Sequence, residues 1–301
     1  MKNFDAVMVT HAKNAKIARI SIKYLIKNAF PDKIYLICAK NIFTEFDRLS
    51  PNLILVDEDS VVPNITFSKM DELIKAIDPR NTRVGWYFQQ FLKMGICARE
   101  DLAGHYLIWD SDTVLLKPLS FFTHDGRVLF TKYAECHPPY FETLRAILGE
   151  KRNCDFSFIV EHMMVNKLMM REMIEKIHQG SLKTGEWVPK IIKSVDPKDI
   201  GLSGFSEYET YGNYVYNRHR ETAEFRRIPT FRKGSAIFGR YPNYFDCARL
   251  ARQYVYASFE SRRWASKNRR RFEKVKSFFI WLFNLPSFIT ILFRKRIEEA
   301  S

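Results

Sequence analysis

Cysteine is scarce in this chain and has none of the spacings that build a zinc site or a disulfide framework. The five cysteines are Cys38, Cys97, Cys136, Cys154 and Cys247. An odd count without a Cys-x-x-Cys pair argues against both kinds of site. A reducing compartment, the cytoplasm, is therefore the simplest expectation.

Glycine-rich nucleotide loops and long apolar runs are also missing. The sequence has no Gly-x-Gly-x-x-Gly fingerprint and no Walker Gly-Lys-Ser/Thr loop, which argues against Rossmann-cofactor and P-loop chemistry. The apolar stretch near the N-terminus is too short and too soon interrupted for a signal peptide. The run from Phe278 to Phe293 contains Asn284 and Pro286 and has fewer than the about 20 residues that a spanning helix needs.

What the chain does have is a globular composition with a basic end. Of its 301 residues 46% are hydrophobic and 15% aromatic, which is enough for a sizeable core. The net charge is +14, but residues 226–301 carry 18 Lys and Arg against 5 Asp and Glu, whereas residues 1–225 carry 30 against 29. A nearly neutral body with a strongly basic tail predicts an anionic partner for the tail.

The order of hydrophobic segments predicts an α/β fold. Strands are expected at 4–9, 33–38, 52–56, 106–109, 127–133 and 155–160, and helices at 14–28, 68–77, 84–99 and 166–178, with a helical or irregular piece before residue 49. This alternation predicts a mostly parallel sheet flanked by helices on both faces. We expect a catalytic domain over 1–225 and a basic, helical C-terminal extension over 226–301.

Two aspartates interrupt the hydrophobic stretch YLIWDSDTVLL, residues 106–116. Burying a carboxylate is costly unless it is paired or binds a metal. In an extended chain, residues two apart face the same way, so Asp110 and Asp112 are expected to converge on one point. Carboxylate oxygens there suit Mg²⁺ or Mn²⁺ completed by substrate phosphates. The alternative is a solvated turn or a helix cap.

Four segments together resemble one class of enzyme. They are GWYFQQFLK (85–93), WDSDT (109–113), EHMM (161–164) and FSEYETYG (205–212). Their order resembles nucleotide-sugar glycosyltransferases of the GT-A fold, and in particular an uncharacterised bacterial group associated with capsule and lipopolysaccharide loci. The resemblance covers roughly residues 4–220. It implies transfer of a sugar from a nucleotide-diphosphate sugar, most simply a UDP-sugar, to a glycan or lipid-linked glycan.

The resemblance gives the donor side of the site its candidate residues. Asp110 and Asp112 would hold the metal, Asp110 also reaching the donor ribose. Ends of strands in this fold contact the nucleotide, which adds Thr10, His11 and Asp57. For Thr10 and Asp57 the competing role is helix capping. Independently, a single helix face holds Trp86, Gln89, Gln90 and Lys93, at spacings i, i+3, i+4 and i+7. Lys93 would bind phosphate and the glutamines the ribose or sugar, unless this is an ordinary half-exposed face.

The acceptor side has candidates among residues 205–219. An inverting transferase needs a carboxylate base for the acceptor hydroxyl, and Glu207 or Glu209 is the candidate. Alternatively, Ser206 and Glu209 form a helix capping box. Tyr208 and Tyr211 would contact the acceptor. His162 and His219 are candidates for a third metal ligand, and His162 also for acceptor binding, although a lone histidine is more often structural.

The tail combines basic and apolar residues, as in RRWASKNRRRFEKVK (262–276) followed by the run from Phe278 to Phe293. This composition predicts a segment lying in the membrane interface, with Lys and Arg meeting anionic lipids. The protein would then be cytoplasmic and attached peripherally to the inner face of the membrane. The alternative is a core or oligomer helix pair broken at Pro286.

Two other functions compete with a metal-dependent glycosyltransferase. A nucleic-acid-binding protein would use the basic, aromatic tail on phosphates and bases. Against it, the body is neutral, no known nucleic-acid motif occurs, and the apolar run would have no purpose. A nucleotidyltransferase or phosphatase could also use the paired aspartates. The donor sugar, the acceptor and the stereochemistry are not determined by the sequence.

Overall fold

The computed structural model describes residues 2–260 of the chain. The basic tail from residue 261 on, with the predicted interfacial segment Phe278 to Phe293, lies outside the described residues. None of the helices within residues 2–260 combines the length and the apolar character of a membrane span.

A five-stranded sheet forms the centre of the molecule and confirms the predicted α/β class. Its order is β3-β2-β1-β4-β7. The strands are β1 (Asp5–Val9), β2 (Ile34–Cys38), β3 (Leu53–Asp57), β4 (His105–Trp109) and β7 (His162–Asn166). The first four are parallel, and β7 runs antiparallel to β4. Residues of β1 and β2 are buried without interruption, which is typical of a parallel sheet covered on both faces.

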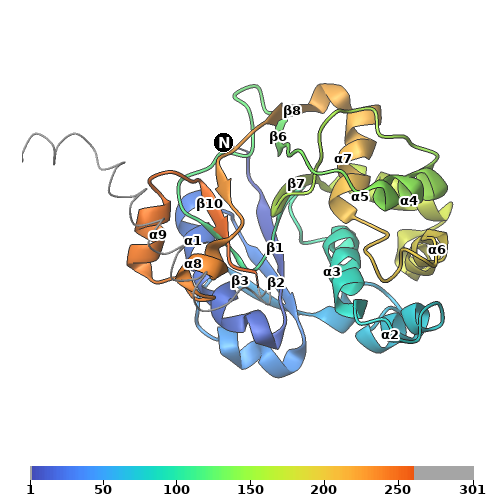
Figure 1. Ribbon diagram of the computed structural model, residues 1–301, viewed down its shortest axis with the longest axis horizontal. Helices are drawn as coiled ribbons and strands as arrows, with labels where there is room; N and C mark the ends of the chain where they lie inside the picture. The colour runs from blue at the N-terminus through green and yellow to red at the C-terminus, as the bar shows by residue number, and fades with distance from the viewer. Residues whose placement is uncertain (1, 261–301) are drawn as a thin grey trace, which may run out of the picture.

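Helices cover the sheet on both sides (Figure 1). The helices are α1 (Ala15–Ala29), α2 (Phe67–Lys75), α3 (Val84–Gly95), α4 (Pro138–Leu148), α5 (Lys167–His178), α6 (Trp187–Ser194), α7 (Glu207–Arg218), α8 (Gly234–Phe238) and α9 (Tyr244–Leu250). Figure 1 shows α1, α8 and α9 on one side and α2 to α7 on the other. The predicted helices near 14–28, 68–77, 84–99 and 166–178 are confirmed as α1, α2, α3 and α5, while the stretch before residue 49 is a 3₁₀ helix, Lys40–Phe46.

One predicted strand is wrong. Residues 155–160 are irregular, apart from a single bridge between Ser157 and Tyr133, and the strand follows as β7. The buried carboxylate of Glu209 explains this, because it accepts hydrogen bonds from Ser157 Oγ at 2.6 Å and from the Phe158 backbone N–H at 3.2 Å. A side chain thus satisfies the backbone group that a strand partner would otherwise bind.

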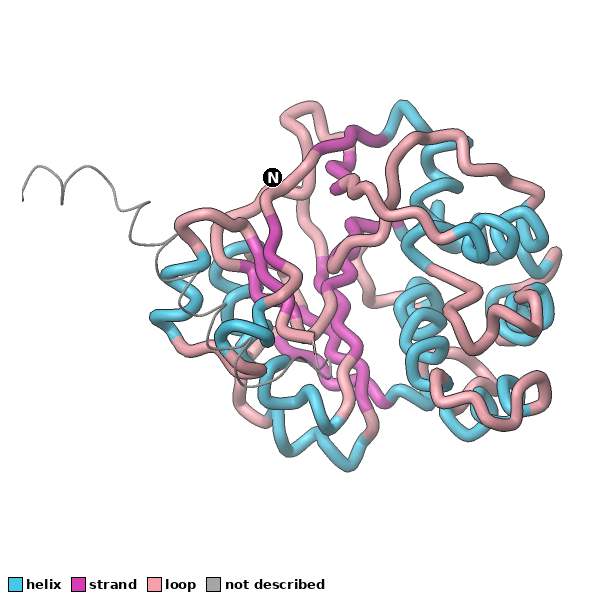
Figure 2. The backbone as a smooth tube through the Cα atoms, viewed as in Figure 1, coloured by secondary structure: helices cyan, strands magenta, loops and turns pink. Residues whose placement is uncertain are grey.

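Two smaller sheets attach the later part of the chain to the first (Figure 2). In one, β10 (Tyr256–Ser258) pairs with β5 (Thr113–Leu115) and β9 (Thr230–Phe231); in the other, β6 (Val128–Thr131) pairs with β8 (Ala223–Arg226). A second apolar cluster joins the β5-β10-β9 sheet to α1 and α9, with Ile17, Val114, Leu116, Cys247, Leu250, Ala257 and Phe259. The expected domain boundary near residue 225 falls inside β8.

Gly212→Ala is expected to destabilise the protein, because an added Cβ would lie 2.2 Å from the Phe158 ring. Alanine is the better helix former by about 1 kcal/mol, but overpacking a core costs about 1–3 kcal/mol. The measurement is urea denaturation. Gly104→Ala is the matched control, since nothing lies within 4 Å of its added Cβ. Equal midpoints for the two variants would contradict the close packing of α7 on Phe158.

Candidate active site

The candidate site lies at the carboxyl ends of the parallel strands. Sheet order runs outward from β1 in one direction to β2 and β3 and in the other to β4, so the order reverses between β1 and β4. Ligands of open α/β sheets bind at such a point. Thr10 follows β1 there and Asp110 follows β4. The Thr10 hydroxyl is buried and has no hydrogen-bond partner within residues 2–260.

Asp110 and Asp112 occupy a tight turn between β4 and β5, and not the extended conformation expected from the sequence. The Thr113 N–H donates to the Asp110 carbonyl at 3.0 Å, which closes the turn. On the far side, the Phe259 N–H donates to the Asp112 carbonyl at 2.8 Å. The turn still keeps the two carboxylates within electrostatic range, because Asp110 is one of the groups that raise the pKa of Asp112.

A buried lysine ties Asp110 to the start of α7. Lys93 Nζ lies 2.7 Å from Asp110 Oδ1 and 2.9 Å from Glu207 Oε1. Tyr208 donates to the same Asp110 oxygen at 3.1 Å, and its ring lies 4.7 Å from the Lys93 ammonium. These four residues, the lysine cluster below, come from α3, the β4 end and α7.

The charged side chains of the lysine cluster differ in their exposure to solvent. The side chains of Lys93 and Glu207 are 5% and 6% exposed, whereas that of Asp110 is 30% exposed and opens to solvent. Burial is the largest single influence on the pKa of Lys93 and would lower it, but Asp110 and then Glu207 outweigh it, so the pKa stays well above its ordinary value. Lys93 is therefore a permanent cation shared by two carboxylates.

Asp112 differs from Asp110 in that no side chain within residues 2–260 binds its carboxylate, which is held only by its own backbone N–H. Burial raises the pKa of Asp112 to about 7, with further contributions from Asp110 and Glu260. A partly buried carboxylate without an ion-pair partner is costly, and a bound cation would relieve that cost.

The donor set fits a divalent cation that is completed by substrate. In the described part of the chain, no three His, Cys, Asp or Glu side chains converge on a metal position. Mg²⁺, however, usually takes one or two carboxylates together with substrate phosphates and water. Asp112 and the second oxygen of Asp110, which no residue within 2–260 binds, could supply two such ligands.

The two glutamates of the FSEYETYG motif have different surroundings. Ser206 caps α7 by accepting from the Glu209 N–H at 3.2 Å, which is one half of the expected capping box; the other half is absent, because the Glu209 carboxylate bonds elsewhere in the described residues. The Glu209 side chain is completely buried and turns away to Ser157, Phe158 and Asn213. Glu207 joins the lysine cluster, and its N–H donates to Gln90 Oε1 at 3.0 Å. Of the pair, only Glu207 lies beside Asp110.

Three other predicted residues lie apart from the lysine cluster. His162 is buried, with its ring stacked on Trp109 and 3.2 Å from Thr131 Oγ1, and burial lowers its pKa to about 3. Tyr211 accepts from the Asn166 N–H at the opposite end of β4. His219 follows the last turn of α7, about 16 Å along the helix axis from Tyr208. Its Nε2 lies 3.2 Å from Glu172.

The predicted nucleotide-binding residues differ in their surroundings, and some of them have other partners. Asp57 ends β3 and caps the next 3₁₀ helix through the Asp59 N–H, which is the capping role that competed with nucleotide binding. His11 is exposed after β1. On α3, Gln90 reaches both Glu207 and the Trp86 carbonyl, while Trp86 and Gln89 are partly exposed.

The sequence interpretation missed Glu161 and Arg232. Because β7 runs antiparallel to β4, the residue before β7, Glu161, lies beside the residue after β4, Asp110. The Glu161 carbonyl accepts a hydrogen bond from the Asp110 N–H at 2.9 Å. Arg232 Nε lies 2.5 Å from Glu161 Oε1, and the other carboxylate oxygen is buried without a partner in the described residues. The sequence does show that Glu161 directly precedes an apolar run. It does not show that this run forms a strand antiparallel to β4, which is what brings Glu161 to Asp110.

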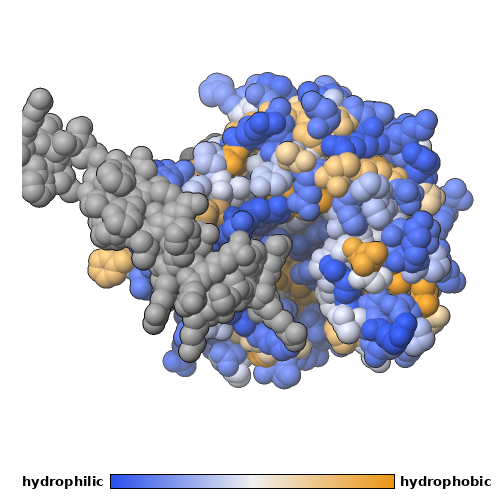
Figure 3. Space-filling view, in the orientation of Figure 1, coloured by the Kyte–Doolittle hydropathy of each residue, from blue (hydrophilic) through white to orange (hydrophobic). Residues whose placement is uncertain are grey.

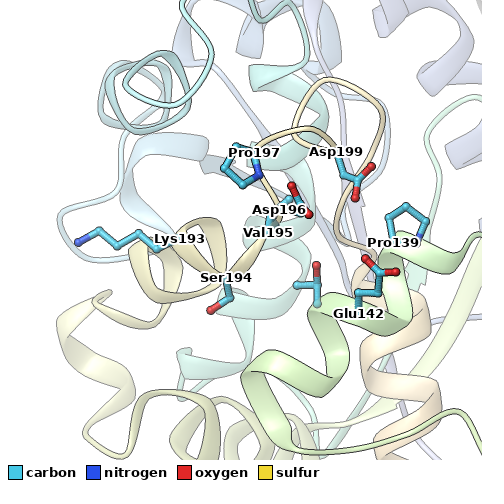
Figure 4. A pocket seen from close by; sticks show the side chains of 9 residues that line it. Pro139, Glu142, Lys193, Ser194, Val195, Asp196, Pro197 and Asp199 are labelled. Atoms are coloured by element: carbon cyan, nitrogen blue, oxygen red, sulfur yellow. The ribbon is translucent and has the colours of Figure 1, made fainter.

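Hollows elsewhere on the surface do not coincide with the lysine cluster. One of about 400 Å³ lies between α4 and the segment after α6, with the carboxylates of Glu142, Asp196 and Asp199 in its wall (Figure 4). Acidic walls repel a diphosphate. Another of about 270 Å³ holds Tyr211 and lies at the amino end of β4. The face shown in Figure 3 is also hollowed near its middle, between the part that holds the sheet and the α3 and α7 side.

Comparisons with known proteins give a family and a set of similar folds. A family model described as "Family of unknown function (DUF6492)" matches residues 2–279. No curated protein matches the chain. Among solved structures, it is similar to the galactosyltransferase LgtC with donor and acceptor sugar analogues, at 11% identity and a TM-score of 0.46 over 90% of this chain and 94% of that one.

Two further solved structures are similar to the chain. Mouse xyloside xylosyltransferase 1 has 11% identity and a TM-score of 0.41, over 86% of this chain and 98% of that one. The bifunctional glycosyltransferase WbbM has 13% identity and a TM-score of 0.44, over 97% of this chain and 51% of that one. All three are glycosyltransferases, the class that the sequence motifs resemble. Because these TM-scores are low, function is inferred from the residues of the site.

Proposed function

The chain belongs to the family of unknown function DUF6492, and for this member we propose a metal-dependent glycosyltransferase that moves a sugar from a nucleotide-diphosphate sugar to a glycan acceptor. The observation that supports the proposal most is the lysine cluster. It joins two carboxylates, those of Asp110 and Glu207, through one buried cation at the point where the strand order reverses. In this proposal Asp110 serves the donor and Glu207 the acceptor.

In this proposal the donor diphosphate approaches Asp110 and Asp112. These carboxylates would hold Mn²⁺ or Mg²⁺, and the cation would neutralise charge on the departing diphosphate. Lys93 and Tyr208 fix Asp110 Oδ1 and leave its other oxygen outward. Thr10 lies at the adjacent strand end, where the nucleoside would lie. A uridine diphosphate sugar and a role in cell-surface polysaccharide synthesis belong to the proposal through the motif resemblance.

Glu207 serves the acceptor in this proposal. Its Oε1 is bound by Lys93, and no residue within 2–260 bonds to its Oε2. Oε2 is therefore the atom proposed to accept a hydrogen bond from the attacking hydroxyl. Glu207 is held at two points, its backbone N–H by Gln90 and one carboxylate oxygen by Lys93, so its side chain is well positioned. Correct orientation supplies much of the rate in transfers between two bound substrates.

Thermal denaturation against a panel of nucleoside diphosphates and sugar nucleotides tests the proposal. A ligand that binds only the folded state stabilises it, by about 2.7 kcal/mol at 100 times its Kd. We expect one nucleoside diphosphate to raise Tm with Mn²⁺ and to have no effect with EDTA. If no nucleotide raises Tm under either condition while RNA or DNA does, the glycosyltransferase proposal is wrong and nucleic-acid binding is favoured.

A further inference from the structure

Arg83 is a cation without an acidic partner within residues 2–260. It makes no ion pair there, and its Nε is buried without a hydrogen bond. Its guanidinium carbon lies 4.5 Å from the centre of the Trp86 ring. The neighbouring Asn81 side chain holds the Arg83 backbone N–H at 2.7 Å, so the residue is fixed at the start of α3. A stacked, unpaired guanidinium is preorganised for a carboxylate or phosphate.

Arg83 belongs to a row of side chains along α3 that leads to the lysine cluster. Arg83, Trp86, Gln90 and Lys93 have spacings of three or four residues, so they lie along one side of the helix. We call these four the α3 row. At a rise of about 1.5 Å per residue, the helix axis advances about 15 Å between Arg83 and Lys93. This distance is roughly the length of two to three sugar units. Gln90 connects the α3 row to α7, because its Oε1 accepts a hydrogen bond from the Glu207 N–H.

A second wall comes from the start of α4. Tyr140 is partly exposed; burial raises its pKa to about 12, and Glu207 raises it while Arg83 lowers it, so both charges act on the same phenol. The ring centre of His137 lies 4.5 Å from that of Tyr140, and its Nε2 lies 2.9 Å from the Ser203 carbonyl. The start of α4 therefore carries two aromatic side chains, His137 and Tyr140, and the α3 row carries a third, Trp86. Such rings are apolar surfaces with polar edges, which suits contact with sugars.

We propose that Arg83 and Trp86 of the α3 row form, together with Tyr140, an acceptor subsite for an anionic glycan, in which Arg83 binds a carboxylate or phosphate group on the acceptor. This inference rests on the proposed function, because Glu207 gives the subsite its reacting end. Trp86 and Tyr140 contact the sugar rings, and Arg83 selects for the negative charge. Within the proposal the anionic group lies about 10–15 Å from the reacting hydroxyl, as the helical rise requires.

Binding of three matched glycosides to the chain without nucleotide tests this subsite. Methyl β-glucoside, methyl β-glucuronide and methyl β-glucoside 6-phosphate differ only at C6, and saturation-transfer NMR reports their binding. We expect at least one anionic glycoside to bind about tenfold more tightly than the neutral one, as a charge-assisted hydrogen bond allows. Preference for the glucuronide assigns a uronic acid, and preference for the phosphate assigns a phosphorylated sugar.

Variants separate charge from packing. Arg83→Gln is expected to remove the preference, Arg83→Lys to retain part of it, and Trp86→Leu to weaken all three glycosides alike. Arg80→Gln is the matched control, since Arg80 is exposed three residues away. Equal binding of the three glycosides, or a preference that survives Arg83→Gln, would overturn the subsite. If Arg83→Gln keeps the nucleotide shift and loses the preference, both proposals stand; if wild type shows the preference without any nucleotide shift, only the proposed function fails.

Discussion

Lys93→Met is expected to abolish sugar transfer and to destabilise the fold. Removing one member of a buried ion pair leaves an uncompensated charge and costs about 3–5 kcal/mol. Here two carboxylates would lose their shared cation, since Lys93 Nζ lies 2.7 Å from Asp110 and 2.9 Å from Glu207. Urea denaturation measures the stability. Release of nucleoside diphosphate from the donor found in the thermal screen measures transfer.

Two comparisons isolate the role of Lys93. Lys40→Met removes an exposed pair with Asp57, whose lysine is 75% exposed, and is expected to cost less than about 1 kcal/mol. The double variant Lys93→Met with Glu207→Gln should be more stable than Lys93→Met alone, because one orphaned carboxylate is removed. A double variant that is no more stable than Lys93→Met would show that Glu207 is not paired with Lys93 in solution.

Asp112→Asn is expected to weaken metal-dependent nucleotide binding without lowering the stability of the fold, unlike Lys93→Met. No side chain within residues 2–260 binds the Asp112 carboxylate, and burial raises its pKa to about 7. Neutral asparagine therefore removes an unfavourable charge and should leave the free energy of unfolding at neutral pH unchanged or higher. Metal-dependent nucleotide binding should weaken about 100-fold or more, since the variant removes one of the two proposed protein ligands.

The measurement is the metal-dependent rise in Tm with the nucleotide identified for wild type. Asp47→Asn provides the matched control, because it makes the same chemical change at an exposed position. Should Asp112→Asn keep the full metal-dependent shift, Asp112 is not a ligand. Should it unfold at lower urea without metal, the carboxylate has a structural partner and the assignment of this residue changes.

Sequence pattern alone was sufficient to predict the parallel half of the sheet. β1, β2 and β3 are short apolar runs that each precede a helix or 3₁₀ helix, and β4 is a short apolar run that ends in the turn with Asp110 and Asp112. Such runs are recognisable because both faces of a parallel sheet are covered, as the unbroken burial of β1 and β2 shows. The same rule was wrong at residues 155–160. That run is apolar and buried too, but the hydrogen bonds of Ser157 and Phe158 go to Glu209, more than 50 residues away.

The candidate site was predictable in its parts and not in its connections. The spacing of Gln90 and Lys93 places them on one side of α3, and Asp110 was identified from the strand end. No local signal indicates that Lys93 pairs with Asp110 and Glu207, because Glu207 is 114 residues from Lys93 and the pairing depends on how α3 packs on α7. For the same reason Lys93 was expected on phosphate, whereas the structure engages it with carboxylates.

The pairing of β10 with β5 also sets when the site can form during synthesis. The turn that holds Asp112 receives a backbone hydrogen bond from Phe259, and Ser258 lies opposite Thr113 in the ladder. A nascent chain that has not yet released residues 256–259 from the ribosome can assemble β1 to β4 but cannot fix this turn. Because such long-range pairing is slow compared with local contacts, completion of the aspartate pair follows formation of the central sheet.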